Sequence, residues 1–535
     1  MRSDKETIKR IISGCARSGM SRRRFITGCA ACAGTAGLTG ASSWLRSGLS
    51  SIGGGTSGRL GGKIRIHIIY ALHAAKQDRP DWPNLGFDFQ PIMDTANGEL
   101  ARRFPGWMFV PNLATGPEQA QIILNIDKTA PVDGYIVFQM NCWNRVAQTM
   151  ATSGKPVLYA DFKYAGSGGF LVYTAGFLRA GARNVGFVGS SNFEDLIEAV
   201  RLFEKAKAAG PGFDFAGETA TIRVSRTPKP GDLACVPDVV TALSGAETVR
   251  RMRASKILAV RDDKSGPETT IMSIPVVQVP FAEVNEAWAA ADKDEAKSIA
   301  ARWTKTAALV EGVSLKELEN SAAMYLGQKA VLKKYGANAI TINCLGGFYG
   351  GHIHAYPCLG FHELLNEGLV GACECDVPST AAMVAVGAMT EGRPGYISDP
   401  VLDTSMRRII YAHCVASNRA FGPKGAANPF QILTHSEDRQ GASLRSLLPT
   451  GFMTTSVEVS NERKEILFHR AKAVANDPDD RACRTKLVAE PVGDFEKLFT
   501  MWDTWGWHRV TFYGDLKEPV RALADALGWK VIEEA

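Results

Sequence analysis

The sequence lacks a strong excess of one charge once its first sixty residues are set aside. Those residues carry ten Lys or Arg against two Asp or Glu, so the formal net charge of +6 leaves the remainder near −2. A protein that binds nucleic acid needs a net basic footprint on its folded domain. We therefore expect no nucleic acid among the partners of this chain.

The sequence also lacks cysteines at the paired spacing that holds zinc. Three of its eleven cysteines fall in the first sixty residues, and the other eight are scattered as far as Cys483. Cys373 and Cys375 flank a glutamate and lie on one side of the chain if that segment is extended, which suits small buried side chains. An export compartment would permit disulfides, but the spacing identifies none.

No apolar run is long enough to span a bilayer stably. The stretch 27–45 is weakly apolar, short and glycine-rich, and it follows the basic segment 21–26 (SRRRFI). Together they resemble a twin-arginine export signal; the alternative is an amphipathic arm or a disordered basic tail. The resemblance implies the twin-arginine translocation machinery as a partner, a periplasmic or extracellular location, and no permanent membrane anchor.

Alternating strand and helix signals predict the fold class. A β-type run at 63–72 follows a glycine-rich linker, and apolar strands at 134–139 and 156–160 are separated from it by a helix at 119–126. Such alternation is typical of a parallel, doubly wound sheet. A strand at 184–189 is expected to belong to a second unit of this kind.

The length and 45% hydrophobic content allow two or three such units. The prediction is an α/β fold: two doubly wound α/β domains followed by a C-terminal mixed α+β domain that carries a metal site. The predicted parts are a signal and linker at 1–62, an N-terminal domain at 63–169, a second domain with linking helices at 170–335 and a C-terminal domain at 336–535.

Carboxylates in the last third of the chain predict the metal site. Glu374 and Asp376 lie on one face of an expected strand at 371–376, which a helix follows. The next strand is expected to end at Asp399. Because a strand-helix-strand return places two strand ends side by side, we expect Glu374 and Asp399 to share one ion.

Two histidines complete the predicted ligand set. His413 lies near the end of the following strand, and His508 directly precedes the strand 509–513. Oxygen and imidazole ligands together suit Mn²⁺ or a similar divalent cation with open positions for substrate oxygens. The alternatives are solvated strand-end carboxylates at Glu374, a turn-forming Asp399, a hydrogen-bonded core histidine at His413 and a surface histidine at His508.

The stretch 357–414 resembles the C-terminal core of the L-fucose and L-arabinose isomerase superfamily. By this resemblance Glu374 and Asp399 match the two metal carboxylates, and His508 matches the C-terminal histidine ligand. His413 matches a ligand of arabinose-type enzymes that fucose-type enzymes lack, whereas Asp399 is the fucose-type choice. The specific motifs cover only the last third of the chain, and their mixture means that it need not belong to either enzyme group.

The resemblance implies an exported, metal-dependent isomerase that interconverts aldose and ketose through an ene-diol. Glu374 and Asp399 would be the acid/base pair as well as metal ligands. It also implies a homo-oligomer, a trimer or a hexamer. The alternatives are a metal-dependent carbohydrate lyase, epimerase or hydrolase on the same fold, or a non-catalytic exported sugar-binding protein.

Six polar or aromatic residues are candidates for sugar contact. Tryptophan faces stack on sugars, although most tryptophans belong to a core. Three candidates follow expected strands: His73, Trp143 and Asn144. The other three lie in the glycine-rich stretch that opens the C-terminal domain: Asn343, His352 and His354.

Overall fold

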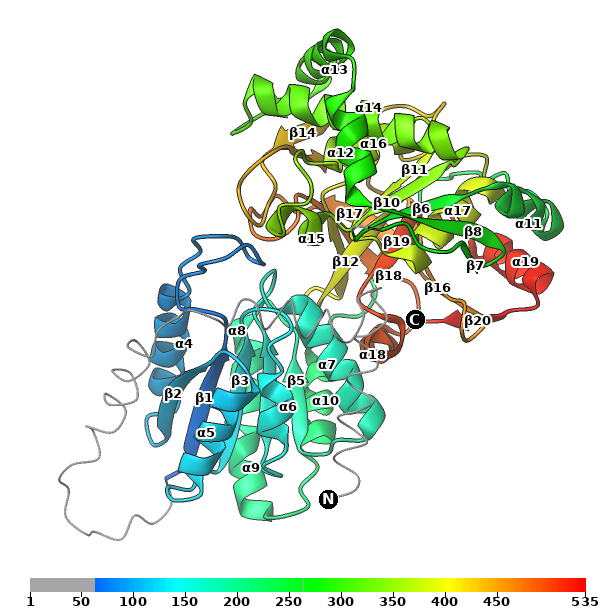
Figure 1. Cartoon of the computed structure of the whole chain (residues 1–535). Coiled ribbons are helices and arrows are strands. Elements are labelled where there is room, and N and C mark those ends of the chain that lie inside the picture. Colours follow the sequence, from blue (N-terminus) through cyan, green and yellow to red (C-terminus); the bar gives the residue numbers. More distant parts are fainter. Residues whose placement is uncertain (1–62, 263) are drawn as a thin grey trace.

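The computed structural model describes residues 63–262 and 264–535 (Figure 1). The predicted export signal and linker at 1–62 lie outside the described residues. Within the described ranges, every helix is too short or too polar to cross a membrane.

The first unit is a five-stranded parallel sheet in the order β2-β1-β3-β4-β5. Its elements are β1 (Arg65–Ala71), α4 (Gln90–Arg103), β2 (Met108–Ala114), α5 (Pro117–Asp127), β3 (Gly134–Gln139), α6 (Val146–Ala151), β4 (Val157–Asp161), α7 (Ser167–Ala180), β5 (Val185–Val188), α8 (Phe193–Val200), α9 (Leu202–Ala209) and α10 (Phe215–Arg226).

Strand β1 shows why helices cover both faces of this sheet. Ile66, Ile68 and Tyr70 pack in one apolar cluster with α4, α8 and α9. Ile69 and Ala71 pack in another with α5, α6 and α7. Because successive side chains of a strand point to opposite faces, a strand with apolar side chains on both faces needs cover on both. The predicted doubly wound α/β architecture is confirmed.

The predicted boundary between the first two domains is wrong. It separates residues 169 and 170, which both lie within helix α7. The strand expected in the second unit is β5, the edge strand of the first sheet, and Val185 pairs with Val157 of β4. Pairing between strands that are distant in sequence decides this boundary, and a local sequence pattern does not reveal which strands pair.

The second unit is built on a five-stranded sheet in the order β11-β10-β6-β8-β7, parallel except for the β7–β8 hairpin. Its strands β10 and β11 come from beyond the predicted boundary at 335/336, which therefore also divides a sheet. Its elements, with the short strand β9, are α11 (Gly245–Ala254), β6 (Ile257–Val260), β7 (Thr269–Ile271), β8 (Ile274–Val279), α12 (Phe281–Ala289), α13 (Lys293–Thr306), β9 (Leu309–Val310), α14 (Leu315–Tyr335), β10 (Ala339–Ile342), α15 (Cys344–Tyr349), α16 (Cys358–Asn366), β11 (Val370–Ala372) and α17 (Val377–Met389).

The third unit is an antiparallel barrel. Its six strands close because β16 pairs with β19 and with β17, the two ends of the order β19-β12-β13-β18-β17. Strand β20 extends β17, and β14 and β15 form a small sheet with β9. The elements are β12 (Gly395–Asp403), β13 (Arg408–His413), β14 (Phe430–Leu433), β15 (Ser443–Ser446), β16 (Met453–Ser460), β17 (Glu465–Asn476), β18 (Thr485–Pro491), the 3-10 helix η2 (Phe495–Phe499), α18 (Trp502–Trp505), β19 (Arg509–Tyr513), α19 (Lys517–Leu527) and β20 (Lys530–Glu533).

The first unit meets the barrel at the carboxyl ends of its parallel strands. Asp403, at the end of β12, accepts a hydrogen bond from the backbone N–H of Ser191 at 3.1 Å. Its other carboxylate oxygen lies 3.2 Å from Nζ of Lys163, just after β4. Helix α18 packs against α7 in the same contact region (Figure 1). The strand ends that bind ligands in such folds therefore face β12.

Candidate metal centre

Glu374 lies in a tight turn after β11. Glu374 and Cys375 have φ angles of 62° and 52°, in the left-handed region that few residues other than glycine adopt. The backbone N–H of Cys375 donates to the carbonyl of Ile342 at 3.0 Å and holds this turn against β10. The predicted strand at 371–376 is therefore wrong beyond Ala372, and strained backbone of this kind is concentrated at functional sites.

Asp399 lies in the middle of β12, opposite Ala412 of β13, and not at the strand end where it was predicted. Its side chain is buried, with the residue 2% exposed. Because β11 and β12 belong to different sheets, the expected strand-helix-strand return does not bring Glu374 and Asp399 together. They meet because the barrel packs against the turn after β11.

The four predicted ligands converge. Nε2 of His508 lies 3.3 Å from Oε2 of Glu374 and 3.1 Å from Oδ1 of Asp399. Nε2 of His413 lies 3.6 Å from Oε1 of Glu374. One ligand atom each from Glu374, Asp399 and His508 fall within 4.8 Å of one another. This spacing places two carboxylates and an imidazole around one point.

The site is strongly polarised. Burial lowers the pKa of His413, but the carboxylates of Asp399 and Glu374 outweigh this effect and raise it to about 9. The same balance, dominated by Glu374 after burial, raises the pKa of His508 well above its usual range. Burial raises the pKa of Glu374, yet the two imidazoles hold it well below its usual range. The carboxylates therefore favour positive charge at this point.

Two buried atoms of the site lack hydrogen-bond partners. Among the described residues, Oδ1 of Asp399 and Nε2 of His413 make no hydrogen bond although both are buried. Buried polar atoms in native proteins nearly always have a partner. A divalent cation bound by Glu374, Asp399 and His508 would be the missing partner of the Asp399 oxygen, and this mixed oxygen and nitrogen set fits Mn²⁺.

His413 fits a ligand role less well than the other three. The backbone N–H of Cys414 donates to Nδ1 of His413 at 3.0 Å. A bound cation would neutralise the two carboxylates that raise the pKa of His413, and a neutral imidazole that accepts at Nδ1 carries its proton on Nε2. In this tautomer Nε2 donates a hydrogen bond and does not bind a metal, so the geometry disfavours the predicted ligand role of His413.

His508 is held by groups whose role the sequence did not reveal. Oδ2 of Asp376 lies 2.8 Å from Nδ1 of His508, which directs Nε2 toward the carboxylates. Oδ1 of Asp376 accepts from the backbone N–H of Ser379 and caps α17. Arg509 donates to the carbonyl of His508 at 2.7 Å. The N-cap signal of Asp376, followed by proline at the second helical position, was readable in the sequence, but its contact with His508 was not.

The loops after β1 and β3 face this site. The strand order 2-1-3-4-5 places the topological switch point between β1 and β3, where α/β sheets bind their ligands. His73 lies there, with its Nε2 2.8 Å from Oδ2 of Asp81. Asn144 lies there too, but it is buried and bonds the carbonyls of Ala71 and Asn141. Asn144 therefore ties the two loops together and has no amide hydrogen left for a sugar.

Three tryptophans connect the switch point to the metal centre. The ring of Trp507 makes edge contacts with Trp82 at 5.2 Å and with Trp143 at 5.6 Å between centroids. Trp143 is 37% exposed, so part of its ring is available to a ligand. Trp507 stacks on the neighbouring His508, and its Nε1 donates to the carbonyl of Pro400. Of the predicted sugar contacts, His73 and Trp143 lie on this side of the site.

The other three predicted sugar contacts have structural partners elsewhere. Asn343 caps α15 by accepting from the backbone N–H of Gly346. The rings of His352 and His354 pack on Phe281 and Trp288 of α12. These contacts are with α12 and with the first turn of α15, and none of them is with Glu374, Asp399 or His508.

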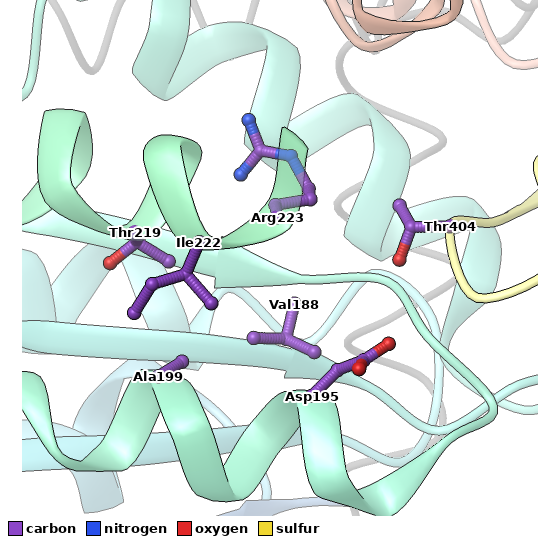
Figure 2. A pocket seen from close by; sticks show the side chains of 7 residues that line it. All are labelled: Val188, Asp195, Ala199, Thr219, Ile222, Arg223 and Thr404. Atoms are coloured by element: carbon purple, nitrogen blue, oxygen red, sulfur yellow. The ribbon is translucent and has the colours of Figure 1, made fainter. Parts of the chain in front are cut away.

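A small internal cavity lies away from the metal centre (Figure 2). Its volume of about 10 Å³ is at the limit for a single water molecule and excludes a sugar. It is lined by Val188, Asp195, Ala199, Thr219, Ile222, Arg223 and Thr404.

No protein-family model matches the sequence. Over 227 residues the chain is 26% identical to a sulfoquinovose isomerase from Clostridium sp. (strain MSTE9), an alignment that covers 41% of this chain and 49% of that protein. The chain thus spans about half the length of the curated relative it matches, and part of it is similar to a carbohydrate isomerase.

One solved structure, an ABC transporter solute binding protein from Bacillus halodurans C-125 with bound myo-inositol, matches 64% of this chain and 93% of that chain. Its sequence identity is 15% and the TM-score is 0.16, so this likeness carries no argument.

Proposed function

We propose that this protein is a metal-dependent carbohydrate isomerase that interconverts an aldose and a ketose through an ene-diol. The observation that carries the proposal is the convergence of Glu374, Asp399 and His508, in which the buried Oδ1 of Asp399 lies 3.1 Å from Nε2 of His508 yet accepts no hydrogen bond from the described residues. The partial similarity to a protein named sulfoquinovose isomerase supports it. Export by the twin-arginine route and assembly into a homo-oligomer remain proposals from sequence resemblance.

The residues of the site divide into three roles. Glu374, Asp399 and His508 would hold Mn²⁺ or a similar cation, which when bound would polarise the sugar oxygens. One of the two carboxylates takes a proton from one sugar carbon and returns it to the next. His413 donates from Nε2 to a sugar oxygen, because Cys414 keeps its Nδ1 as the acceptor.

The aromatic side of the site would position the sugar. Trp143 offers a partly exposed ring at the switch point, and such rings stack on the apolar faces of sugars. Asp81 fixes the ring of His73 through Nε2, so Nδ1 is the ring nitrogen that can hydrogen-bond a sugar hydroxyl. The substrate would then lie between the first α/β unit and the barrel, with its reacting carbons toward Glu374 and Asp399.

The test is a substrate screen with the protein loaded with Mn²⁺. Free pentoses, hexoses, 6-deoxyhexoses and sulfoquinovose are each incubated in D₂O, and the sugars are examined by NMR after protein and metal are removed. Interconversion of aldose and ketose is the expected result. A different product would indicate an epimerase, lyase or hydrolase, and binding without turnover would indicate a sugar-binding protein.

A matched pair of variants tests the site itself. Glu374→Gln keeps the side-chain size and removes the charge, so we expect it to lose metal and turnover. Glu367→Gln makes the same change at a carboxylate whose partners are Lys329, 3.0 Å away, and the hydroxyl of Tyr325, and it should leave both unchanged. If the Glu374→Gln protein retains full metal content and activity, the proposed site is wrong.

A further inference from the structure

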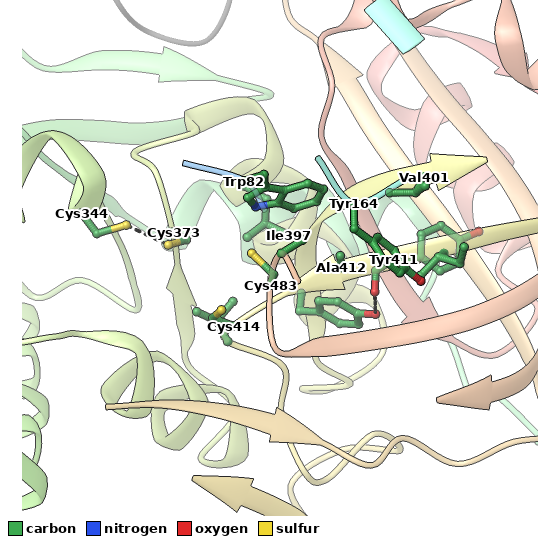
Figure 3. Packing of buried hydrophobic residues seen from close by; sticks show 14 of the residues in the cluster. Trp82, Tyr164, Cys344, Cys373, Ile397, Val401, Tyr411, Ala412, Cys414 and Cys483 are labelled. Atoms are coloured by element: carbon green, nitrogen blue, oxygen red, sulfur yellow. Dashed lines mark hydrogen bonds between the residues drawn. The ribbon is translucent and has the colours of Figure 1, made fainter. Parts of the chain in front are cut away.

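Two cysteines from different segments face one another beside the metal centre. Cys344 begins α15, directly after β10 and Asn343, and Cys373 follows β11. Their sulfur atoms point toward each other (Figure 3) and lie 2.9 Å apart. Two other sulfur contacts of the same core, from Cys414 to Ser436 and from Cys483 to Asp399, are 3.9 and 3.8 Å long.

The backbone already holds the two thiols at bonding range. Strands β10 and β11 are adjacent and parallel, with Thr341 opposite Ala372. The hydroxyl of Thr341, within β10, donates to the carbonyl of Cys373, just beyond β11, at 3.3 Å. A covalent S–S bond of about 2.05 Å therefore needs the sulfurs to approach by less than about 1 Å.

A shared metal does not explain this contact. Among the described residues, the ligand groups of three or more include Cys373 with Glu374 and His413, but none includes Cys344. Cys344 therefore has a sulfur partner and no further ligand for an ion. Both residues are buried, at 2% and 5% exposure, so the pair is sheltered from most external reagents once the core has formed.

We propose that Cys344 and Cys373 form a disulfide when the protein folds in the presence of a disulfide oxidant such as oxidised glutathione. In the net exchange the S–S bond of oxidised glutathione breaks and the Cys344–Cys373 bond forms. The two thiol hydrogens end on two molecules of reduced glutathione.

The disulfide would also change the chemistry of the neighbouring centre. Cys373 Sγ is a soft ligand within 4.8 Å of ligand atoms of Glu374 and His413. Bonding to Cys344 removes this sulfur as a potential ligand and leaves oxygen and nitrogen ligands, which favour Mn²⁺ over softer ions. This consequence rests on the proposed metal site, whereas the disulfide itself does not.

The test is disulfide mapping of the full chain. One sample is treated with oxidised glutathione as purified, and a second is refolded from guanidinium in a glutathione redox buffer. Both are then unfolded with excess N-ethylmaleimide, digested and analysed by mass spectrometry without reduction. In the refolded sample we expect a linked peptide pair containing Cys344 and Cys373, and a higher melting temperature than that of the reduced protein; in the sample treated as purified, burial of the pair should slow or prevent the linkage.

Two variants keep the assignment specific. Cys344→Ala should leave Cys373 capped by N-ethylmaleimide and unpaired, whereas Cys142→Ala, at a buried thiol that donates to the carbonyl of Ala165, should leave the linkage intact. Capping of both Cys344 and Cys373 in the two wild-type samples would overturn the proposal. So would a linkage of Cys373 to a different cysteine. Because the readout is a covalent bond, neither result depends on isomerase activity.

Discussion

Asp376 uses its two carboxylate oxygens for two different tasks. Oδ2 accepts from Nδ1 of His508 at 2.8 Å, and Oδ1 accepts from the backbone N–H of Ser379 at 3.1 Å. An asparagine at this position has one acceptor oxygen, so it can cap α17 or orient His508, but not both. Asp376→Asn should therefore impair the metal centre while leaving the fold largely intact.

The expected magnitude follows from these contacts. Loss of a group that orients a metal-bound histidine typically lowers metal affinity by about 10- to 100-fold. This range corresponds to about 1.4 to 2.8 kcal/mol of binding free energy. Asp376→Ala should lose the same affinity and, in addition, about 1 kcal/mol of stability from the missing N-cap.

The assay combines calorimetric titration of the metal-free protein with Mn²⁺ and urea unfolding without metal. Asp292 is the matched control, because it caps α13 by accepting from the backbone N–H groups of Asp294 and Glu295, both at 2.9 Å. Asp292→Ala should lower the urea midpoint as Asp376→Ala does, without weakening Mn²⁺ binding. If Asp376→Asn binds Mn²⁺ within twofold of the wild type, the reasoning about His508 is refuted.

Three further predictions concern the surroundings of the site. A Cβ at Gly168 would lie 2.4 Å from the Trp507 ring, so Gly168→Ala should cost about 1–3 kcal/mol of stability. Gly98→Ala in α4 meets no atom within 4 Å and should stabilise the helix by up to about 1 kcal/mol; thermal unfolding that ranks the two variants the other way contradicts this packing. His413→Asn should retain its metal but lose about 100-fold or more in kcat, whereas loss of metal, measured by elemental analysis, would restore the ligand role. Burial raises the pKa of Asp161 from 3.8 to about 7. As the pH rises from about 4 to 7, this carboxyl ionises in the unfolded chain but keeps its proton in the folded protein, so the free energy of unfolding falls by up to about 4 kcal/mol. Asp161→Asn should therefore gain stability relative to the wild type over that range, and unfolding curves whose difference does not change with pH would contradict it.

Elements with a strong local pattern could be predicted from the sequence. The strand at 134–139 matches β3, and the strand at 509–513 matches β19, because both are rich in the β-branched and aromatic residues that favour strands. The segment 371–376 could not be predicted. Its extended pattern ends at Ala372, where a hydrogen bond to the carbonyl of Ile342 on β10 stabilises a left-handed turn. A contact with a distant segment thus overrides the local preference.

The candidate site shows the same division between local and distant information. Carboxylate and imidazole side chains at the ends of likely strands identified Glu374, Asp399 and His508 as a group. The glycine-rich stretch that opens the predicted C-terminal domain selected His352 and His354 as sugar contacts, but their rings pack on α12. Residue type and position along the chain selected both sets, and only the direction of each side chain separates them.

Local sequence patterns were enough to predict doubly wound α/β units and to select two carboxylates and two histidines as candidate ligands of a cation. These properties follow from side-chain chemistry and from periodicity along the chain. Only the tertiary structure decided that Glu374 and Asp399 approach from two different sheets. It also decided that Asp376 orients His508 and that Cys414 sets the proton on His413. These relations are distances between segments far apart in sequence, and they exist only after the barrel has packed against the turn that follows β11.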